Sequence, residues 1–129
     1  MSRDLVDKEF NRAQESLQAA QKLLEDDLFA DAVSRAYYAC LHGAKAALLT
    51  EGVKVSSHRA VLRLFGEHLI KAGKMEKEYG KVLREEQEDR EVCDYDVFQI
   101  VESDRASQRV QDAERFLERI RNFVEKSFA

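Results

Sequence analysis

The sequence predicts an all-α protein: an antiparallel up-and-down helical bundle of four core helices with an additional short helix. The 129 residues include no proline and only five glycines, and they are rich in the strongest helix-forming residues. Apolar residues recur at spacings of three and four over long stretches, as in amphipathic helices. Short connections between these stretches favour antiparallel neighbours. We predict one domain over residues 1–129, long enough to bury a continuous core.

The first three predicted helices follow from apolar seams and helix-stop signals. The first helix carries a seam at Val6, Phe10, Ala13, Leu17, Ala20 and Leu24. A more buried helix from about residue 29 to Thr50 stops at Gly52, since glycine readily adopts the backbone conformation that ends a helix. Ser56 or Ser57 caps a third helix, which ends at Gly73.

The fourth predicted helix, from about Met75 to Cys93, becomes polar where its core stripe should continue. Glu86 and Arg90 occupy these stripe positions. A polar residue there either lies at the mouth of a site or is paired, and Arg90 can pair with Asp94 four residues later. The last helix repeats the apolar seam at Ala106, Val110, Ala113, Leu117, Ile120 and Val124.

The second helix carries the main candidate site. Arg35 and His42 lie seven residues apart, so their side chains fall within about 20° on one face and roughly 10.5 Å apart along the axis. Tyr38 and Lys45 extend the same stripe. This pattern suits chemistry on a phosphodiester, because arginine binds phosphate bidentately and histidine titrates near neutral pH. The alternative is a solvated helix face.

A strip of small residues on the same helix predicts a close helix neighbour. The strip consists of Ala39, Gly43, Ala46 and Thr50. A glycine inside a helix costs about 1 kcal/mol relative to alanine unless another element packs close against it. The neighbour can come from the same chain or from a second copy. We predict a homodimer through this helix, which would bring two Arg35/His42 stripes together.

The charge of the chain is unevenly distributed. The formal net charge is −4, which argues against a surface made for nucleic acid. Residues 52–84 nevertheless hold eight Lys and Arg against three Glu, whereas residues 85–104 hold nine acids against one Arg. The basic region could steer a phosphate backbone or an acidic partner, and the acidic region could dock a basic partner. Both regions could equally be solvated helix faces.

Targeting and metal-binding signals are absent from the sequence. It holds no run of about 18 apolar residues and no signal peptide, so we predict a cytoplasmic protein with no membrane contact. Cys40 and Cys93 lack metal-ligand spacing and are expected to be thiols buried in helices. No acid lies three residues before a histidine, unlike in di-iron bundles. We therefore predict no metal and no cofactor. We expect His58 to influence a helix start and His68 to lie at the surface.

Four blocks of this sequence resemble the HEPN family, in the order in which that family has them. They are the run from Ser34 through Arg35 and His42 to Leu49, Ser57–Val61 leading to Leu64-Phe65-Gly66, Arg90 to Asp94-Tyr95-Asp96, and Ala113–Phe116. The likeness is to the small stand-alone prokaryotic branch. It implies a helical bundle, a homodimer, and pairing with a minimal nucleotidyltransferase as a toxin–antitoxin system.

The family signature is an arginine, four to six residues and a histidine, here Arg35 and His42. In many members this is a metal-independent ribonuclease site completed across the dimer, which implies RNA as substrate. Ribonuclease members often have a polar residue after the arginine, where this chain has Ala36. A tyrosine two residues after the histidine is modified with AMP in one branch. Ala44 excludes that position here, although Tyr37, Tyr38 or Tyr95 could serve.

We therefore predict a HEPN-type toxin that acts as a metal-independent endoribonuclease at a dimer interface. Arg35 and His42 are the expected catalytic residues, and Tyr38 and Lys45 are expected to bind substrate. The alternative is a non-catalytic module that binds a nucleotide or a partner and is associated with a nucleotidyltransferase. A purely structural adaptor would leave the Arg35/His42 stripe without a role.

Overall fold

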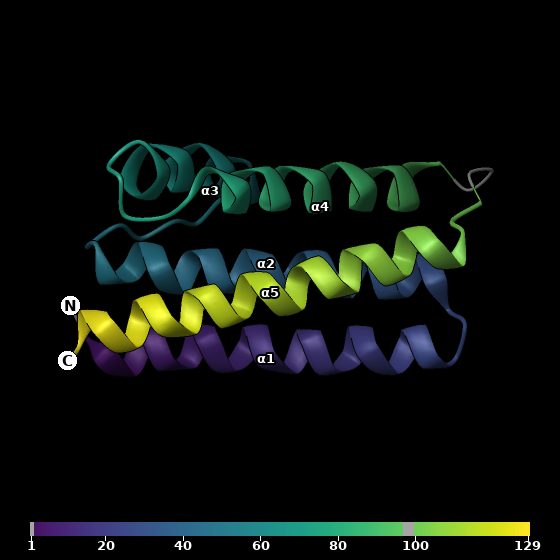
Figure 1. Cartoon of the computed structure of the whole chain (residues 1–129), viewed down its shortest axis with the longest axis horizontal. Coiled ribbons are helices and arrows are strands. Elements are labelled where there is room, and N and C mark those ends of the chain that lie inside the picture. Colours follow the sequence, from purple (N-terminus) through teal and green to yellow (C-terminus); the bar gives the residue numbers. More distant parts are fainter. Residues whose placement is uncertain (1, 97–99) are drawn as a thin grey trace.

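The chain folds into long helices that run up and down along one another (Figure 1). The computed structural model describes residues 2–96 and 100–129, and that part contains no strand. The elements are α1 (Arg3–Glu25), α2 (Phe29–Thr50), α3 (His58–Phe65), the π-helical turn η1 (Gly66–Ile70), α4 (Lys77–Tyr95) and α5 (Ser103–Ser127). Both chain ends lie at the same end of the bundle (Figure 1). The predicted all-α fold, four long helices and one short one, is confirmed.

The helix boundaries follow the expected stop signals. Gly52 and Gly73 have φ angles of +77° and +76°, in the left-handed region that favours glycine. The short helix continues through η1, where the Lys71 amide donates to the Gly66 carbonyl at 2.9 Å. No helix in the described part of the chain is both long and apolar enough to cross a membrane.

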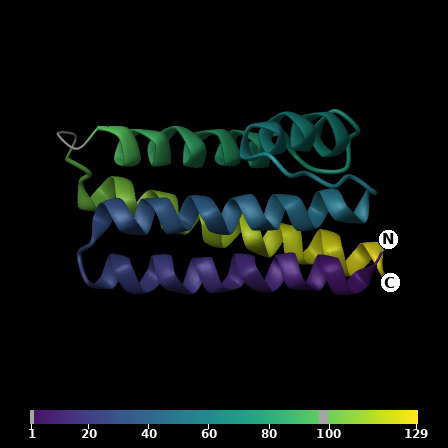
Figure 2. The same ribbon diagram turned by 180° about the vertical axis from the view of Figure 1, so that it is seen from behind.

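Helix α2 forms the centre of the bundle and packs against α1, α3, α4 and α5. Figure 2 shows it from behind, between α1 and α4. Its apolar seam is buried, including Tyr37, Cys40 and Leu48, which agrees with the more buried helix predicted for this part of the chain. Helix α5 completes the core through Phe116, whose ring centroid lies 5.6 Å from that of Phe65. Burial of these apolar faces, at about 25 cal/mol per Å², is the main stabilising contribution.

The small-residue strip of α2 packs against α5 of the same chain. A Cβ atom placed on Gly43 would lie 2.6 Å from Leu117 Cδ2, closer than the two atoms can approach. Ala39 and Ala46 on the same strip have no exposed surface. The close neighbour is therefore intramolecular, and the strip gives no support to a dimer through this face.

The two polar residues predicted on the α4 core stripe have different environments. Arg90 Nε lies 3.0 Å from Asp94 Oδ2, so the predicted pairing is confirmed. Glu86 is neither at a mouth nor paired: it is fully buried, and neither carboxylate oxygen has a hydrogen-bond partner. Burial raises the pKa of Glu86 to about 9. This group is therefore a neutral acid in the core at neutral pH.

Candidate functional site

The Arg35 end of the α2 stripe is open and positively charged. Arg35 is exposed, and its guanidinium carbon lies 5.9 Å from the centroid of the Tyr38 ring. No carboxylate pairs with Arg35 among the residues that the structure describes. A guanidinium without a carboxylate partner keeps its donors available for an anion, and arginine is well suited to phosphate.

Helix α1 contributes a glutamate that holds the His42 end of the stripe. Glu9 Oε2 lies 2.9 Å from His42 Nδ1, and Glu9 Oε1 lies 3.5 Å from Lys45 Nζ. The hydrogen bond with His42 lowers the pKa of Glu9, and the charge of Lys45 adds to this effect. An ionised carboxylate can only accept, so Nδ1 of His42 carries the hydrogen. Nε2 is then the ring nitrogen for proton exchange with a ligand.

Helix α4 adds a second arginine beside Tyr38. Arg90 Nη2 donates to Tyr38 Oη at 3.1 Å, and its guanidinium carbon lies 5.1 Å from the Tyr37 ring centroid. The hydrogen bond with Tyr38 is the main reason that the pKa of Arg90 is raised. Asp94 pairs with Arg90 and accepts a hydrogen bond from Ser34 Oγ at 3.1 Å. Arg90 therefore fixes the Tyr38 hydroxyl and has part of its charge neutralised.

His58, the first residue of α3, lies against the stripe. Its ring centroid is 5.9 Å from that of Tyr38. Desolvation lowers the pKa of His58, and the charges of Arg90, Lys45 and His42 lower it further. The imidazole is therefore neutral at neutral pH. The sequence indicated a role at a helix start; the structure also makes His58 part of the site. His68, on η1, is exposed as expected.

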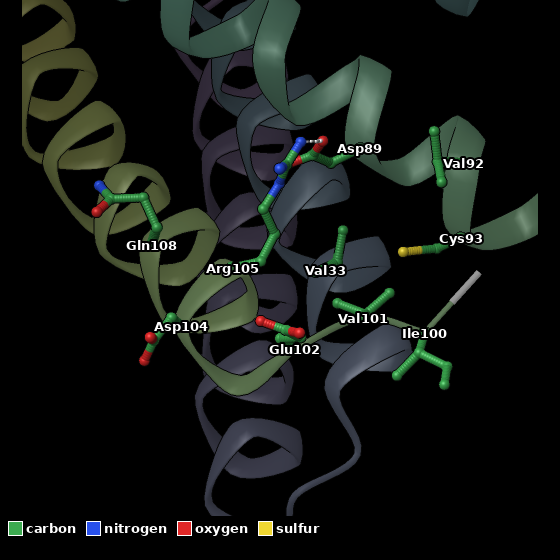
Figure 3. Close-up of a pocket in the computed structure, with 10 residues that line it drawn as sticks. All are labelled: Val33, Asp89, Val92, Cys93, Ile100, Val101, Glu102, Asp104, Arg105 and Gln108. Carbon is green, nitrogen blue, oxygen red and sulfur yellow. Dashed lines mark hydrogen bonds and ion pairs between the residues drawn. The ribbon is translucent and has the colours of Figure 1, made fainter.

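Two cavities border opposite parts of α2. The first, of about 460 Å³, is lined by His42, Lys45 and Glu9 together with basic residues of α1. The second, of about 630 Å³, lies between α4 and α5 and has Asp89, Glu102 and Asp104 in its wall. Figure 3 shows Arg105 extending toward Asp89 in this second cavity. The carboxylates of the second cavity disfavour a phosphate ligand. The first cavity contains His42 and Lys45 and is therefore the one that suits the chemistry of the stripe.

The cysteines and carboxylates form no metal centre in the described ranges. Neither thiol is in a disulfide; Cys40 is buried, and Cys93 is half-buried in the wall of the second cavity. No group of three or more His, Cys, Asp or Glu side chains within residues 2–96 and 100–129 is arranged to hold a metal ion.

The fold and the stripe define a class: a small helical bundle whose central helix presents an arginine and a histidine on one polar face. The HEPN domain matches residues 6–125 of this chain. A Methanocaldococcus jannaschii protein named "Putative toxin" is 36% identical over 114 residues, covering 88% of this chain and 84% of the relative. The chain belongs to the HEPN family.

One bacterial and one archaeal relative extend the comparison. A protein of Thermotoga maritima named UPF0332 is 35% identical over 114 residues, covering 88% of this chain and 86% of the relative. An Archaeoglobus fulgidus protein of the same name is 32% identical over 124 residues, covering 96% of this chain and 98% of the relative. The likeness to these relatives therefore extends over most of each chain.

Proposed function

We propose that this chain is a HEPN-type toxin that cleaves single-stranded RNA without a metal, as a homodimer using Arg35 and His42 of both protomers. The observation that carries the proposal is the combination on one face of α2. Arg35 is exposed and has no ion pair in the described part of the chain, and His42 is oriented by Glu9 at 2.9 Å. The name of the M. jannaschii relative supports the toxin role.

The proposed reaction uses a nucleophile that RNA itself supplies. The 2′-oxygen attacks the adjacent phosphorus, the bond from phosphorus to the 5′-oxygen breaks, and the products are a 2′,3′-cyclic phosphate and a 5′-hydroxyl. His42 Nε2 takes the proton of the 2′-hydroxyl or gives one to the leaving oxygen. Arg35 binds the phosphate and stabilises the charge of the transition state, and Tyr38 and Lys45 position it.

One histidine cannot readily accept and donate a proton in the same step, so a reaction with both a general base and a general acid needs two histidines. His42 of the second protomer is one source of the second group. His58 is another, because its neutral imidazole lies beside Tyr38 in the same protomer. A neutral imidazole can accept a proton at pH 7, so His58 suits the role of general base.

A non-catalytic binding module is the second candidate function. Ala36 follows Arg35 where ribonuclease members often carry a polar residue, and this favours binding over cleavage. Arg35, Arg90 and Lys45 could hold a nucleotide phosphate with no proton transfer.

The cleavage proposal is tested with purified protein and single-stranded RNA in the presence of EDTA. We expect cleavage with 2′,3′-cyclic phosphate ends and a loss of roughly 10²-fold or more in His42→Ala and Arg35→Ala. Both variants should keep the wild-type unfolding midpoint. Cleavage that EDTA abolishes, or that persists in His42→Ala, refutes the mechanism. RNA binding with no product supports the binding module.

We also propose a minimal nucleotidyltransferase as antitoxin partner. The segregated basic and acidic regions of the chain should make association salt-dependent. Co-expression followed by pull-down at low and moderate salt tests this, and failure to co-purify at both salt concentrations counts against the partner. Light scattering of the chain alone tests the homodimer.

A further inference from the structure

We propose that the groove between α1, α2 and the segment before α3 binds an RNA strand. It holds the phosphates that neighbour, in the same strand, the phosphate at Arg35 and His42. This α1–α2 groove is the cavity of about 460 Å³, and it includes His42 and Lys45. Its remaining cations are Lys8 and Arg12 of α1 and Lys54 of the connecting segment. The inference rests on the proposed function, because it takes RNA as the ligand of the stripe.

The charge of the groove is strongly one-sided. Four permanent cations face one carboxylate, and that carboxylate, Glu9, is engaged by both His42 and Lys45. In the described part of the chain, Lys8, Arg12 and Lys54 form no ion pair. In a chain of net charge −4, such a group of unpaired cations around one cavity produces a local field that attracts an anion.

The groove also continues the stripe in a defined direction. Residues 5, 8, 9 and 12 lie on one face of α1, and His42, Lys45 and Leu49 lie on the facing side of α2. From His42 the groove extends away from Arg35, past Lys45 and Leu49 to Lys54 beyond the C-terminal end of α2. Because α1 runs antiparallel to α2 and Glu9 contacts His42, Arg12 lies at the other end of the groove, on the Arg35 side of Glu9. A chain of phosphates with one member at Arg35 and His42 can therefore place its next members among these cations.

Apolar side chains in the groove suit nucleosides better than a free anion. Leu5, Leu49 and Val55 also line it; Leu5 is 47% exposed, whereas Leu49 and Val55 are largely buried. The exposed Leu5 can bury apolar surface against an unpaired base while the neighbouring cations hold the phosphates. This combination favours a single strand over inorganic phosphate.

A third cavity, of about 650 Å³, lies between α3, η1 and α4. It is also basic and serves as the internal comparison. It includes Lys71, Lys81 and Arg84, but also two acids, Glu67 and Glu78. Glu67 pairs with Arg63 of the same cavity at 3.4 Å. This cavity does not include any residue of the Arg35/His42 stripe. Its cations are therefore a matched control for net charge.

The experiment measures binding without cleavage, using a short labelled 2′-O-methyl oligoribonucleotide whose blocked 2′-oxygen cannot attack. The groove variant carries Lys8→Gln, Arg12→Gln and Lys54→Gln, and the control variant carries Lys71→Gln, Lys81→Gln and Arg84→Gln. Each phosphate contact on a single strand contributes about 0.7 to the slope of log affinity against log salt. The groove variant should therefore lose about 2 from that slope and bind about 10²-fold more weakly at 0.1 M salt.

The control variant has the same change in net charge and should bind like the wild type. Equal losses in the two variants, no loss in the groove variant, or no binding by the wild type overturns the proposal. The proposal is also overturned if AMP competes for the site as well as the oligonucleotide does, because that result indicates a mononucleotide site. If the groove variant unfolds at a lower temperature, each single substitution should still reduce the slope by about 0.7. Groove-dependent binding without cleavage of unmodified RNA leaves this inference standing and refutes the nuclease.

Discussion

Replacing Glu86 by glutamine should stabilise the protein and flatten its pH dependence near neutral pH. Glu86 has no exposed surface, and its two carboxylate oxygens have no hydrogen-bond partner. Arg109 of α5 is the nearby cation, but its guanidinium already lies 3.0 Å from Asp112 and 3.5 Å from Asp89. Little of its charge is left to stabilise an ionised Glu86, so desolvation dominates and raises the pKa of Glu86 to about 9.

The magnitude follows from the difference in pKa between the folded and unfolded chains. An unfolded glutamate has a pKa near 4.5, whereas folded Glu86 keeps its proton up to about pH 9. Between these values the folded state binds more protons, so the free energy of unfolding falls as pH rises. The slope is about 1.4 kcal/mol per pH unit, which gives about 3 kcal/mol between pH 5.5 and 7.5. Glu86→Gln removes this slope.

Urea unfolding at several pH values measures the effect as the difference between variant and wild type. The free energy of unfolding of Glu86→Gln, relative to that of the wild type, should rise by about 3 kcal/mol as pH increases from 5.5 to 7.5. His58, whose pKa is lowered, titrates in both proteins and cancels in the difference. Glu88→Gln, on an exposed residue of the same helix, is the control and should leave the slope unchanged. A difference between Glu86→Gln and wild type that stays constant over this range would refute the reasoning.

Three further predictions concern single residues of α1, α2 and α3. Gly43→Leu should lower the free energy of unfolding by several kcal/mol in urea titrations, because its side chain would collide with Leu117. Glu9→Gln should reduce RNA cleavage and shift its pH profile, while Glu15→Gln, exposed on the same helix, should not; identical profiles would exclude orientation of His42 by Glu9. His58→Ala decides which histidine is the second: a fall in kcat of about 10²-fold, absent in the His68→Ala control, assigns the role to His58, whereas unchanged turnover assigns it to His42 of the second protomer.

Helix positions and the polar stripe could be predicted because both follow from local periodicity. The seam of α2 and the stripe with Arg35 and His42 require only the helical repeat, and Gly52 ends its helix through a local backbone preference. The identity of the helix packed on Gly43 could not be predicted. A small-residue strip indicates close approach, but it does not distinguish α5 of the same chain from a second copy.

The missed members of the site come from other helices, where no local pattern marks them. Glu9 is one of several acids on α1, and only the packing of α1 on α2 brings it within 2.9 Å of His42. His58 follows two serines that suggest a helix cap, yet no Ser57 side-chain cap is formed, and the histidine ring packs near Tyr38 instead. Arg90 has an obvious local partner in Asp94, which conceals its second contact with the Tyr38 hydroxyl at 3.1 Å. The candidate stripe can thus be predicted from one helix alone. The groups that orient its histidine and fix its tyrosine depend instead on contacts between residues that are 33 and 52 positions apart in the sequence.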